Sequence, residues 1–440
     1  MLIAPMADKA TLPVLPLAGH HHILLAVSGG SDSTALLLLA AWQRQTLANP
    51  PQITAVTVDH RLRSGSTAEA RAVETMCAAL GIRHMILAWE GDKPTSGIQD
   101  AARNARRSLI AAAAVRIGAD IVFTGHTYDD QLETVAMRQK RGTGPGLAGI
   151  APVSFVFDDA GAGEVVQFRR PMLGASRAVL QSLLKLSGIS WVDDPSNDND
   201  AFERVAVRRE LAQSDRSRHA ELAHACRQAA SGRITASRSA ARLVEDFVFA
   251  TAPGLIRIDH AIASVTETEC AAVLRILMAF SAGTPFPAEI AHAVRLQNSW
   301  RQALANSKVS PVRIGLGGAL ADIRRDGLYL LQEQRRNIPN PASFAGRYRL
   351  TGIEPASNPP PPNADPVSAP ASLIRKAAVA EPIFDCPSAG ATSCDEAYRN
   401  GRRLRLLLNP WPDLVPSFDL PAYNSLAAVI GAPQIDSPLL

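Results

Sequence analysis

Paired cysteines are absent from this sequence of 440 residues. The five cysteines stand apart and form no Cys-x-x-Cys motif: Cys77, Cys226, Cys270, Cys386 and Cys394. An odd and scattered set suits neither a zinc site nor a disulfide framework, and it fits a reducing compartment. The composition therefore excludes a small domain held together by disulfides.

Long uninterrupted hydrophobic runs are also absent. The most apolar stretch, residues 23–42, is interrupted by the polar residues 28–33 and is too broken to cross a membrane. The first residues show no basic segment followed by an apolar one, so no signal peptide is expected. With 47% hydrophobic residues the chain is neither collagen-like nor wholly disordered. We expect a cytoplasmic protein of two or three domains with no membrane partner.

Lysine is scarce. Of the 45 basic residues only six are lysine, and the other 39 are arginine. Arginine presents a planar fork of donors to phosphate, which favours a nucleotide or nucleic-acid partner. A genome rich in G and C would produce the same bias without any function. The net charge of +4 does not decide between the two explanations, so the placement of the arginines matters more than their number.

The first 195 residues alternate short apolar runs with longer helical patterns. Strands are predicted at residues 23–27, 53–59, 83–89 and 121–125, and helices at residues 34–47, 67–80, 99–118 and 128–140. Short, continuously apolar strands are typical of a parallel sheet covered by helices on both faces. The order predicts an α/β fold with a doubly wound parallel sheet, Rossmann-like, whose ligand binds at the carboxyl ends of the strands.

The rest of the chain follows a different pattern. Residues 202–305 look helical and arginine-rich without strand alternation, and a hairpin is predicted from residues 312–320 and 327–331 with its turn at 322–326. Residues 355–372 include four consecutive prolines and are typical of an extended linker. We predict four regions: a catalytic α/β domain (1–200), a mainly helical domain ending in the hairpin (201–336), a proline-rich linker (337–372) and a C-terminal segment of undefined structure (373–440), with a strand near 402–408.

A loop rich in serine and glycine follows the first predicted strand and opens a helix. It reads Ser28-Gly29-Gly30-Ser31-Asp32-Ser33. Two glycines let the backbone approach an anion, and the hydroxyls and the first N–H groups of the helix can donate to it. The motif is neither a Walker A loop nor a dinucleotide-binding G-x-G-x-x-G. A plain junction with Ser and Asp as helix caps is the alternative, but the complete motif at this position favours a phosphate-binding loop.

Acidic residues gather after the fourth predicted strand. The segment starts at His126 and contains Asp129, Asp130 and Glu133 in the first turns of a helix. Because His126, Asp130 and Glu133 are spaced by four and three residues, they share one helical face at the carboxyl end of the strand. Helix capping explains one or two acidic residues there, but not a histidine together with three acids.

Basic residues precede and follow this acidic segment. Arg103 and Arg106 lie one helical turn apart in the helix predicted over residues 99–118, and Lys140 and Arg141 open a glycine-rich turn. Arg204 and Arg208 form a further pair at the start of the arginine-rich region. A solvated surface is the ordinary role of such residues, and contact with phosphate is the alternative.

The loop at residues 28–33 resembles the pyrophosphate-binding loop of the N-type ATP pyrophosphatases, which split ATP between its α- and β-phosphates. Within that superfamily, residues 22–211 are similar to the tRNA(Ile)-lysidine synthase family. The similarity rests on the His-x-x-Asp-Asp-Gln-x-Glu pattern at 126–133, the Arg-Gly-Thr-Gly turn at 141–144, the Ala-Arg-x-x-Arg pattern at 102–106, the segments at 169–173 and 191–197, and Arg204 with Arg208. The chain departs from the family pattern at Arg61, where the family has glycine, at Arg107, usually aromatic, and at Val205, often asparagine.

The resemblance implies a ligase that uses ATP and Mg²⁺ to join L-lysine to the wobble cytidine of tRNA(Ile) with a CAU anticodon. The C2 oxygen of the cytidine attacks the α-phosphate, AMP becomes attached and pyrophosphate leaves. The ε-amine of lysine then displaces AMP and leaves lysidine, which changes decoding from AUG to AUA. The helical region is the expected tRNA-binding domain. The sequence leaves open whether the chain forms a homodimer.

Carried over residue by residue, the resemblance implies three groups of functional residues. The expected ATP-binding residues are Ser28, Gly29, Gly30, Ser31, Asp32, Ser33 and His126. The expected catalytic residues are Asp32, Arg103, Asp130 and Glu133. The expected contacts to the substrate and tRNA are Arg106, Lys140, Arg141, Arg204 and Arg208. Asp32 and Asp130 are the expected Mg²⁺ ligands, although the sequence does not divide lysine activation and Mg²⁺ binding between Asp130 and Glu133.

Two alternatives remain at this stage. A tRNA thiolase of the same superfamily would need a nucleophilic cysteine or an iron–sulfur cluster, and the predicted α/β domain offers only Cys77. A non-catalytic module that binds nucleotide or tRNA would need the loop and the arginines, and it leaves His126, Asp130 and Glu133 without a role.

Overall fold

The structure is a computed structural model. It describes residues 12–61, 65–91, 93–142, 144–158, 164–192, 203–252, 254–306, 311–333, 343–344, 348–352, 369–378, 402–406, 408–411 and 413–436. Residues 193–197 of the segment at 191–197, most of the predicted proline-rich linker, Cys386 and Cys394 lie outside the described residues. The chain divides into two compact units, one of residues 1–158 and 164–233 and the other of residues 159–163 and 234–440.

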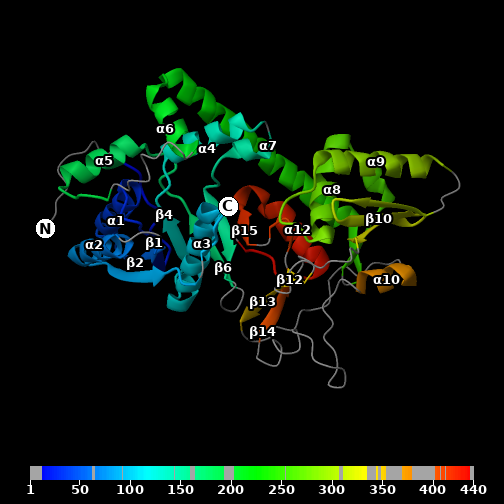
Figure 1. Cartoon of the computed structure of the whole chain (residues 1–440), viewed down its shortest axis with the longest axis horizontal. Coiled ribbons are helices and arrows are strands. Elements are labelled where there is room, and N and C mark those ends of the chain that lie inside the picture. The colour runs from blue at the N-terminus through cyan, green and yellow to red at the C-terminus, as the bar shows by residue number, and fades with distance from the viewer. Residues whose placement is uncertain are drawn as a thin grey trace. The chain divides into compact units, whose positions relative to one another are not determined.

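The first unit contains a largely parallel sheet (Figure 1). Its strands are β1 (His22–Ala26), β2 (Gln52–Asp59), β3 (Arg83–Ala88), β4 (Ile121–Thr124), β5 (Val153–Phe157) and β6 (Val165–Arg169). Within this unit they lie in the order β5-β6-β4-β1-β2-β3, and β5 is antiparallel to β6 while the other neighbours are parallel. The chain returns from β3 to β4 across β1, so the direction of winding reverses between β1 and β4. Ligands of such sheets bind at this point.

Helices cover both faces of the sheet, which confirms the doubly wound α/β prediction. They are α1 (Ser31–Arg44), α2 (Ser66–Ala79), α3 (Ile98–Ile117), α4 (Tyr128–Lys140), α5 (Arg177–Leu186) and α6 (Glu203–Gln213), with a 3₁₀ turn η1 (Pro145–Ala148). Side chains of α1, α2 and α5 share one buried cluster with Ile23, Leu25 and Phe123 of the sheet. Because side chains alternate along a strand, Leu24 and Val122 face the other side, where α3 packs.

Helix α7 (Arg216–Phe247) starts in the first unit and continues into the second. The second unit contains an antiparallel sheet in the order β7-β8-β11-β10-β9 and a smaller sheet in the order β12-β13-β14. The elements of this unit are β7 (Val248–Ala252), β8 (Leu255–Ile258), η3 (His260–Ser264), α8 (Glu267–Ala282), α9 (Ile290–Ala305), β9 (Val312–Leu316), β10 (Ala319–Arg324), β11 (Gly327–Gln332), β12 (Ser343–Phe344), β13 (Tyr348–Gly352), α10 (Ala371–Ala378), β14 (Arg402–Leu406), β15 (Leu414–Pro416), η4 (Ser417–Asp419) and α12 (Leu420–Ile430).

Two expectations for this region were wrong. The predicted strand at 312–320 is two strands, β9 and β10, joined at Gly317 and Gly318, whose positive φ angles of 59° and 90° suit the tight turn of a hairpin. Strand β10 then runs on to Arg324, so Asp322 lies inside the strand and not in the predicted turn. The region expected to be helical also holds the hairpin β7–β8, with Gly254 at φ 71° beside its turn.

The predicted domain boundaries at residues 200, 336 and 372 remain predictions. Helix α6 lies in the first compact unit, and β12 and β13 lie in the range expected to be linker. No helix in the described part of the chain is long and apolar enough to cross a membrane.

Candidate active site

The serine- and glycine-rich loop connects β1 to α1 at the point where the winding of the sheet reverses. Gly29 has a φ of 88°, and a Cβ atom there would lie 3.2 Å from Cγ2 of Val73. The Ser33 hydroxyl accepts from the Ser28 N–H at 3.1 Å and donates to the Gly30 carbonyl at 3.1 Å. No side chain caps the N-terminus of α1. The first N–H groups of the helix therefore point into a preformed loop, which is the arrangement that binds phosphate.

The end of β4 lies directly against this loop. A Cβ atom on Gly125 would lie 2.9 Å from both Cα and the backbone nitrogen of Ser33, so only glycine fits without a shift of the backbone. The close approach brings the segment after β4, which starts with His126, next to the start of α1. The phosphate-binding loop and the acidic segment therefore belong to one site.

Asp130 has two roles in this site. It completes a capping box at the start of α4, because its Oδ2 accepts from the Thr127 N–H at 2.8 Å while the Thr127 hydroxyl accepts from the Asp130 N–H. The capping explanation thus accounts for one oxygen of this carboxylate. The other oxygen, Oδ1, accepts from two arginines, Arg177 at 3.0 Å and Arg204 at 2.7 Å.

Glu133 lies one turn further along α4 and is 1% exposed. Its Oε1 accepts from Arg177 at 3.1 Å and from Arg208 at 2.9 Å, and its Oε2 accepts from Arg204 at 2.7 Å. Helix α6 carries Arg204 and Arg208, and it packs on α4 through Val207 and Leu211. This packing sets the two arginines against the acids, whereas the sequence analysis expected them at the tRNA.

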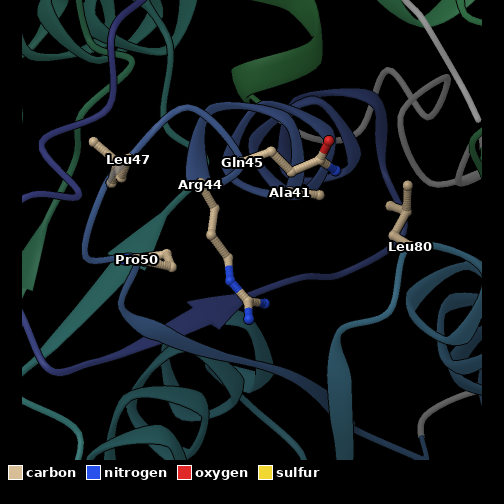
Figure 2. Close-up of a pocket in the computed structure, with 6 residues that line it drawn as sticks. All are labelled: Ala41, Arg44, Gln45, Leu47, Pro50 and Leu80. Atoms are coloured by element: carbon tan, nitrogen blue, oxygen red, sulfur yellow. The ribbon is translucent and has the colours of Figure 1, made fainter.

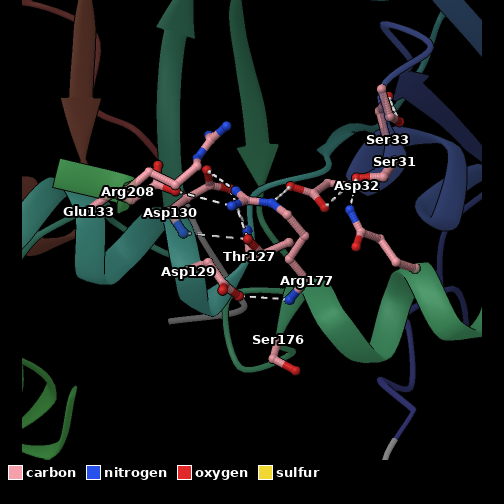
Figure 3. Close-up of polar contacts among 12 residues, drawn as sticks. Ser31, Asp32, Ser33, Thr127, Asp129, Asp130, Glu133, Ser176, Arg177 and Arg208 are labelled. Atoms are coloured by element: carbon pink, nitrogen blue, oxygen red, sulfur yellow. Dashed lines mark hydrogen bonds and ion pairs between the residues drawn. The ribbon is translucent and has the colours of Figure 1, made fainter. Parts of the chain in front are cut away.

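Arg177 is the residue that the sequence analysis missed. It is the first residue of α5, and its guanidinium group lies among three carboxylates (Figure 3). Nε donates to Oδ2 of Asp32 at 3.0 Å, while the two terminal nitrogens donate to Asp130 and Glu133 at 3.0 and 3.1 Å. Its backbone N–H donates to Oδ2 of Asp129 at 2.7 Å, so Asp129 caps α5. A cation at the N-terminus of a helix is ordinarily unfavourable, which is the one signal in the sequence that points to a nearby group of acids.

These contacts shift the pKa values of the cluster in different directions. Burial alone would raise the pKa of Glu133, but the hydrogen bonds from Arg208 and Arg204 and the charge of Arg177 outweigh it and lower the pKa to about 2. Burial raises the pKa of Asp32 above its usual value, although Arg177 opposes this rise. The three acids in turn raise the pKa of Arg177, whose side chain is 18% exposed. The arginines therefore favour the ionised form of Glu133.

The two histidines at the carboxyl edge of the sheet are neutral at physiological pH. Burial and the charge of Arg170 lower the pKa of His126 to about 4, and its Nδ1 lies 2.9 Å from the Thr124 hydroxyl. Burial and Arg106 lower the pKa of His60 to about 4 as well. Arg106 donates from Nε to Nε2 of His60 at 3.3 Å.

Four of the predicted basic residues make no contact with Asp32, Asp130 or Glu133 within the described structure. Arg106 is engaged with His60, and Arg103 is exposed on the same helix. Lys140 donates to Glu210 at 2.6 Å, and Arg141 pairs with Glu203. These last two pairs are exposed, and such pairs contribute only about 0–1 kcal/mol, so both cations can exchange their partners for phosphate.

A pocket of about 330 Å³ lies elsewhere in this unit (Figure 2). It is lined by Ala41, Arg44, Gln45, Leu47, Pro50 and Leu80. These residues lie at the C-terminal end of α1, which is 14 residues and therefore roughly 20 Å long. The pocket is thus separate from the loop at the other end of the helix and contains none of the predicted site residues.

The described cysteines of this unit are poor nucleophiles. Cys77 is a buried free thiol in α2, and burial with the charge of Glu74 raises its pKa to about 12. Cys226 is also a free buried thiol, and burial raises its pKa. Because the thiolate is the reactive form, neither residue suits sulfur transfer.

Comparison with known proteins agrees with this geometry. A family model described as a PP-loop domain matches residues 5–215. Among solved structures, the U34-tRNA thiolase NcsA from Methanococcus maripaludis is similar at 16% identity with a TM-score of 0.42, over 50% of this chain and 75% of that one. A likeness at this level supports no conclusion about activity.

Two relatives match over much of the chain. One is the tRNA(Ile)-lysidine synthase of Mesorhizobium japonicum, 36% identical over 417 residues and covering 88% of each protein. The other is the tRNA(Ile)-lysidine synthase of Rhizobium meliloti, 39% identical over 315 residues, which cover 67% of this chain and 63% of the relative. This chain therefore belongs to the tRNA(Ile)-lysidine synthase family.

Proposed function

We propose that this protein ligates L-lysine to C2 of the wobble cytidine of tRNA(Ile) in an ATP-dependent reaction, with AMP and pyrophosphate as the other products. One observation carries the proposal. The Arg177 guanidinium contacts Asp32 of the phosphate-binding loop and both Asp130 and Glu133 within 3.1 Å, so one site holds the groups for both half-reactions. The first half-reaction needs the loop, and the second needs the acids.

In the first half-reaction the C2 oxygen of the cytidine attacks the α-phosphate. The loop of residues 28–33 and the free N–H groups of α1 would hold the pyrophosphate as charge develops on it. The target base must leave its stack to reach the loop, and proteins hold such bases by pockets and backbone contacts. Arg103 is the proposed partner of the α-phosphate, and Ser28 to Ser33 with His126 are the proposed ATP contacts.

In the second half-reaction the ε-amine of lysine attacks C2 and AMP leaves. A free lysine ammonium has a pKa of about 10.4, so the amine is mostly protonated and unreactive at neutral pH. Asp130 and Glu133 would bind the ammonium group, and one of them would accept its proton. The low pKa of Glu133, about 2, makes it a weak base, which favours Glu133 as the charge partner of the ammonium group and not as its proton acceptor.

Mg²⁺ with ATP also belongs to the proposal. Carboxylate oxygens are the ligands that Mg²⁺ prefers, and a bound ion would offset charge between the phosphates. As arranged, however, Asp32 and Asp130 both accept from Arg177, and no group of three or more His, Cys, Asp or Glu side chains in the described residues is set to hold a metal. These residues do not form a Mg²⁺ site in this arrangement, and no step above depends on one.

The proposed contacts to tRNA are five basic residues: the exposed Lys140 and Arg141, together with Arg106, Arg204 and Arg208. The helical region after residue 200 is the proposed tRNA-binding part, and a cytoplasmic location and a homodimer remain proposals. The ion pairs of Arg204 and Arg208 with the acids favour Lys140 and Arg141 as the first contacts.

The test is a reaction of the purified chain with ATP, lysine and tRNA(Ile) of CAU anticodon. We expect AMP and a nucleoside with the mass of lysidine after digestion of the tRNA. Asp32→Asn should lower both products by roughly 100-fold or more, while Asp100→Asn, the same change at an exposed position on α3, should not. AMP without lysidine would contradict lysine ligation, and no AMP at all would favour a binding module.

A further inference from the structure

The Arg177 guanidinium fills the place that a substrate cation needs. Each of its three nitrogens donates to a different carboxylate, on Asp32, Asp130 and Glu133, at 3.0–3.1 Å. Asp32 lies at the start of α1, Asp130 and Glu133 lie on α4, and Arg177 contacts all three (Figure 3). A lysine ammonium that binds Asp130 and Glu133 has to enter the same space.

The carboxylate oxygens facing this space are already in use. Both oxygens of Glu133 accept from arginine, as does Oδ1 of Asp130, while Oδ2 of Asp130 is engaged by Thr127. In these ion pairs three carboxylates, on Asp32, Asp130 and Glu133, face three guanidinium groups, on Arg177, Arg204 and Arg208, so acids and arginines are equal in number. A further cation would have to share these oxygens with the arginines and would add a positive charge in a largely buried place, which is costly.

ATP changes this balance. Its phosphates would bring several negative charges to the loop that contains Asp32, and Arg177 already touches Asp32 from the adjoining helix α5. Gln181, one turn along α5, lies 3.4 Å from the Ser31 hydroxyl, so this face of α5 borders the loop. Arginine binds phosphate through two parallel hydrogen bonds, and its long side chain can turn from a carboxylate to a phosphate without movement of the helix.

We propose that Arg177 couples the binding of the two small substrates: it pairs with Asp32, Asp130 and Glu133 when the loop is empty, and it turns to the ATP phosphates when the nucleotide binds. The turn frees Asp130 and Glu133 for the lysine ammonium. This inference rests on the proposed function. Its consequence is that lysine binds well only after ATP, and by linkage that lysine raises the affinity for ATP by the same factor.

The test measures the affinity of the full chain for L-lysine with and without α,β-methylene-ATP, an analogue that the enzyme cannot cleave between the α- and β-phosphates. For the wild-type protein we expect the analogue to raise the affinity for lysine at least tenfold, within the range usual for coupled sites. For Arg177→Gln we expect lysine to bind without nucleotide, with an affinity that the analogue changes less than twofold.

Two further variants serve as controls for the effect of Arg177→Gln on lysine binding. Lys185→Gln removes one positive charge from an exposed position on the same helix, and it should keep the wild-type coupling. Arg177→Lys keeps the charge but loses the planar fork that reaches three acids together, so it should show intermediate coupling, and it serves as the test if Arg177→Gln does not fold. A purely structural role would lower the melting temperature of the Arg177 variants and leave the ratio of the two lysine affinities unchanged.

The results separate this inference from the proposed function. Wild-type protein that forms lysidine but binds lysine equally well with and without the analogue would overturn the coupling and leave the ligase activity intact. The coupling is also overturned if Arg177→Gln shows the wild-type ratio of lysine affinities with and without the analogue. It is overturned as well if no protein binds lysine detectably while lysidine still forms. Wild-type protein that forms no lysidine from ATP, lysine and tRNA(Ile) would overturn the proposed function itself.

Discussion

Nε of Arg177 lies 3.0 Å from Oδ2 of Asp32, although 145 residues separate the two in the chain. The contact joins the start of α5 to the start of α1, and the same guanidinium reaches the acids of α4. The Arg177 guanidinium therefore lies between the loop of residues 28–33 and the acids Asp130 and Glu133. Both proposed half-reactions depend on this arrangement.

The buried carboxylate of Glu133 should make the protein sensitive to acid. Because arginine lowers its pKa from 4.5 to about 2 in the folded state, its ionised form stabilises the protein above pH 4.5, and that contribution is lost as the pH falls from 4.5 to 2. Glu133→Gln should be less stable than wild type at pH 7, since it leaves three guanidinium groups short of a partner. We expect the difference in free energy of unfolding, measured in urea, to shrink between pH 5 and pH 3. Parallel curves for the two proteins over this range would contradict the assigned pKa.

The close approach of β4 to the loop predicts that Gly125 tolerates no side chain. In Gly125→Ala the new Cβ would lie 2.9 Å from the backbone of Ser33, and the resulting shift should cost about 1–3 kcal/mol of stability. Gly174 is the matched control, since a Cβ there meets nothing within 4 Å, and Gly174→Ala should change the free energy of unfolding by less than about 0.5 kcal/mol. Equal effects at the two positions, in urea or thermal unfolding, would rule out the close contact.

Arg61 is the one described residue other than glycine with a positive φ, at 51°. A side chain in this left-handed region costs about 1–2 kcal/mol relative to glycine, partly offset by the greater freedom of glycine in the unfolded chain. Arg61→Gly and Arg61→Ala both remove the guanidinium and its exposed ion pair with Glu90. The difference between their free energies of unfolding therefore reports the backbone strain at this position, and we expect the glycine variant to be more stable by up to about 1 kcal/mol. A more stable alanine variant would show that the backbone here is unstrained.

The exposed cation Arg141 should contact a tRNA phosphate. Loss of one such contact lowers the slope of log affinity against log salt concentration by about 0.7–0.9, so Arg141→Gln should show a shallower slope than wild type. Arg116 is the control, because it is exposed in the last turn of α3, at the far edge of the sheet from the site, and Arg116→Gln should leave the slope unchanged. The same titration of Arg204→Gln and Arg208→Gln decides whether these arginines leave Asp130 and Glu133 to bind tRNA, since an unchanged slope would exclude them as phosphate contacts.

Local patterns predicted β1 to β4 and α1 to α4 of the α/β unit, but not β5, β6 or α5. The helix expected at residues 128–140 is α4 with the same bounds, and the four predicted strands match β1 to β4 within one or two residues. Alternation of apolar runs and helical periods is a property of neighbouring residues, so the sequence shows it directly. The hairpin β7–β8 was missed because its strands are short and Arg257 interrupts the apolar run of β8.

The candidate site was predictable in its parts but not in its connections. The loop and the acids stand in motifs, and the parallel topology brings the ends of β1 and β4 together. Arg177 stands in no motif of its own, and its role depends on the packing of α5 against α1. The partners of Arg204 and Arg208 depend in the same way on the packing of α6 against α4, which no spacing along the chain reveals.

The fate of the C2 oxygen of the wobble cytidine shows whether an adenylated cytidine forms. If the C2 oxygen of the wobble cytidine attacks the α-phosphate and lysine then displaces it, that oxygen leaves with AMP. Transfer RNA(Ile) carrying ¹⁸O at this position should therefore yield lysidine free of the label and AMP carrying one ¹⁸O atom, both read by mass spectrometry of the same reaction. Label that stays in the tRNA or appears in water while AMP remains unlabelled would contradict the adenylated cytidine and the function built on it.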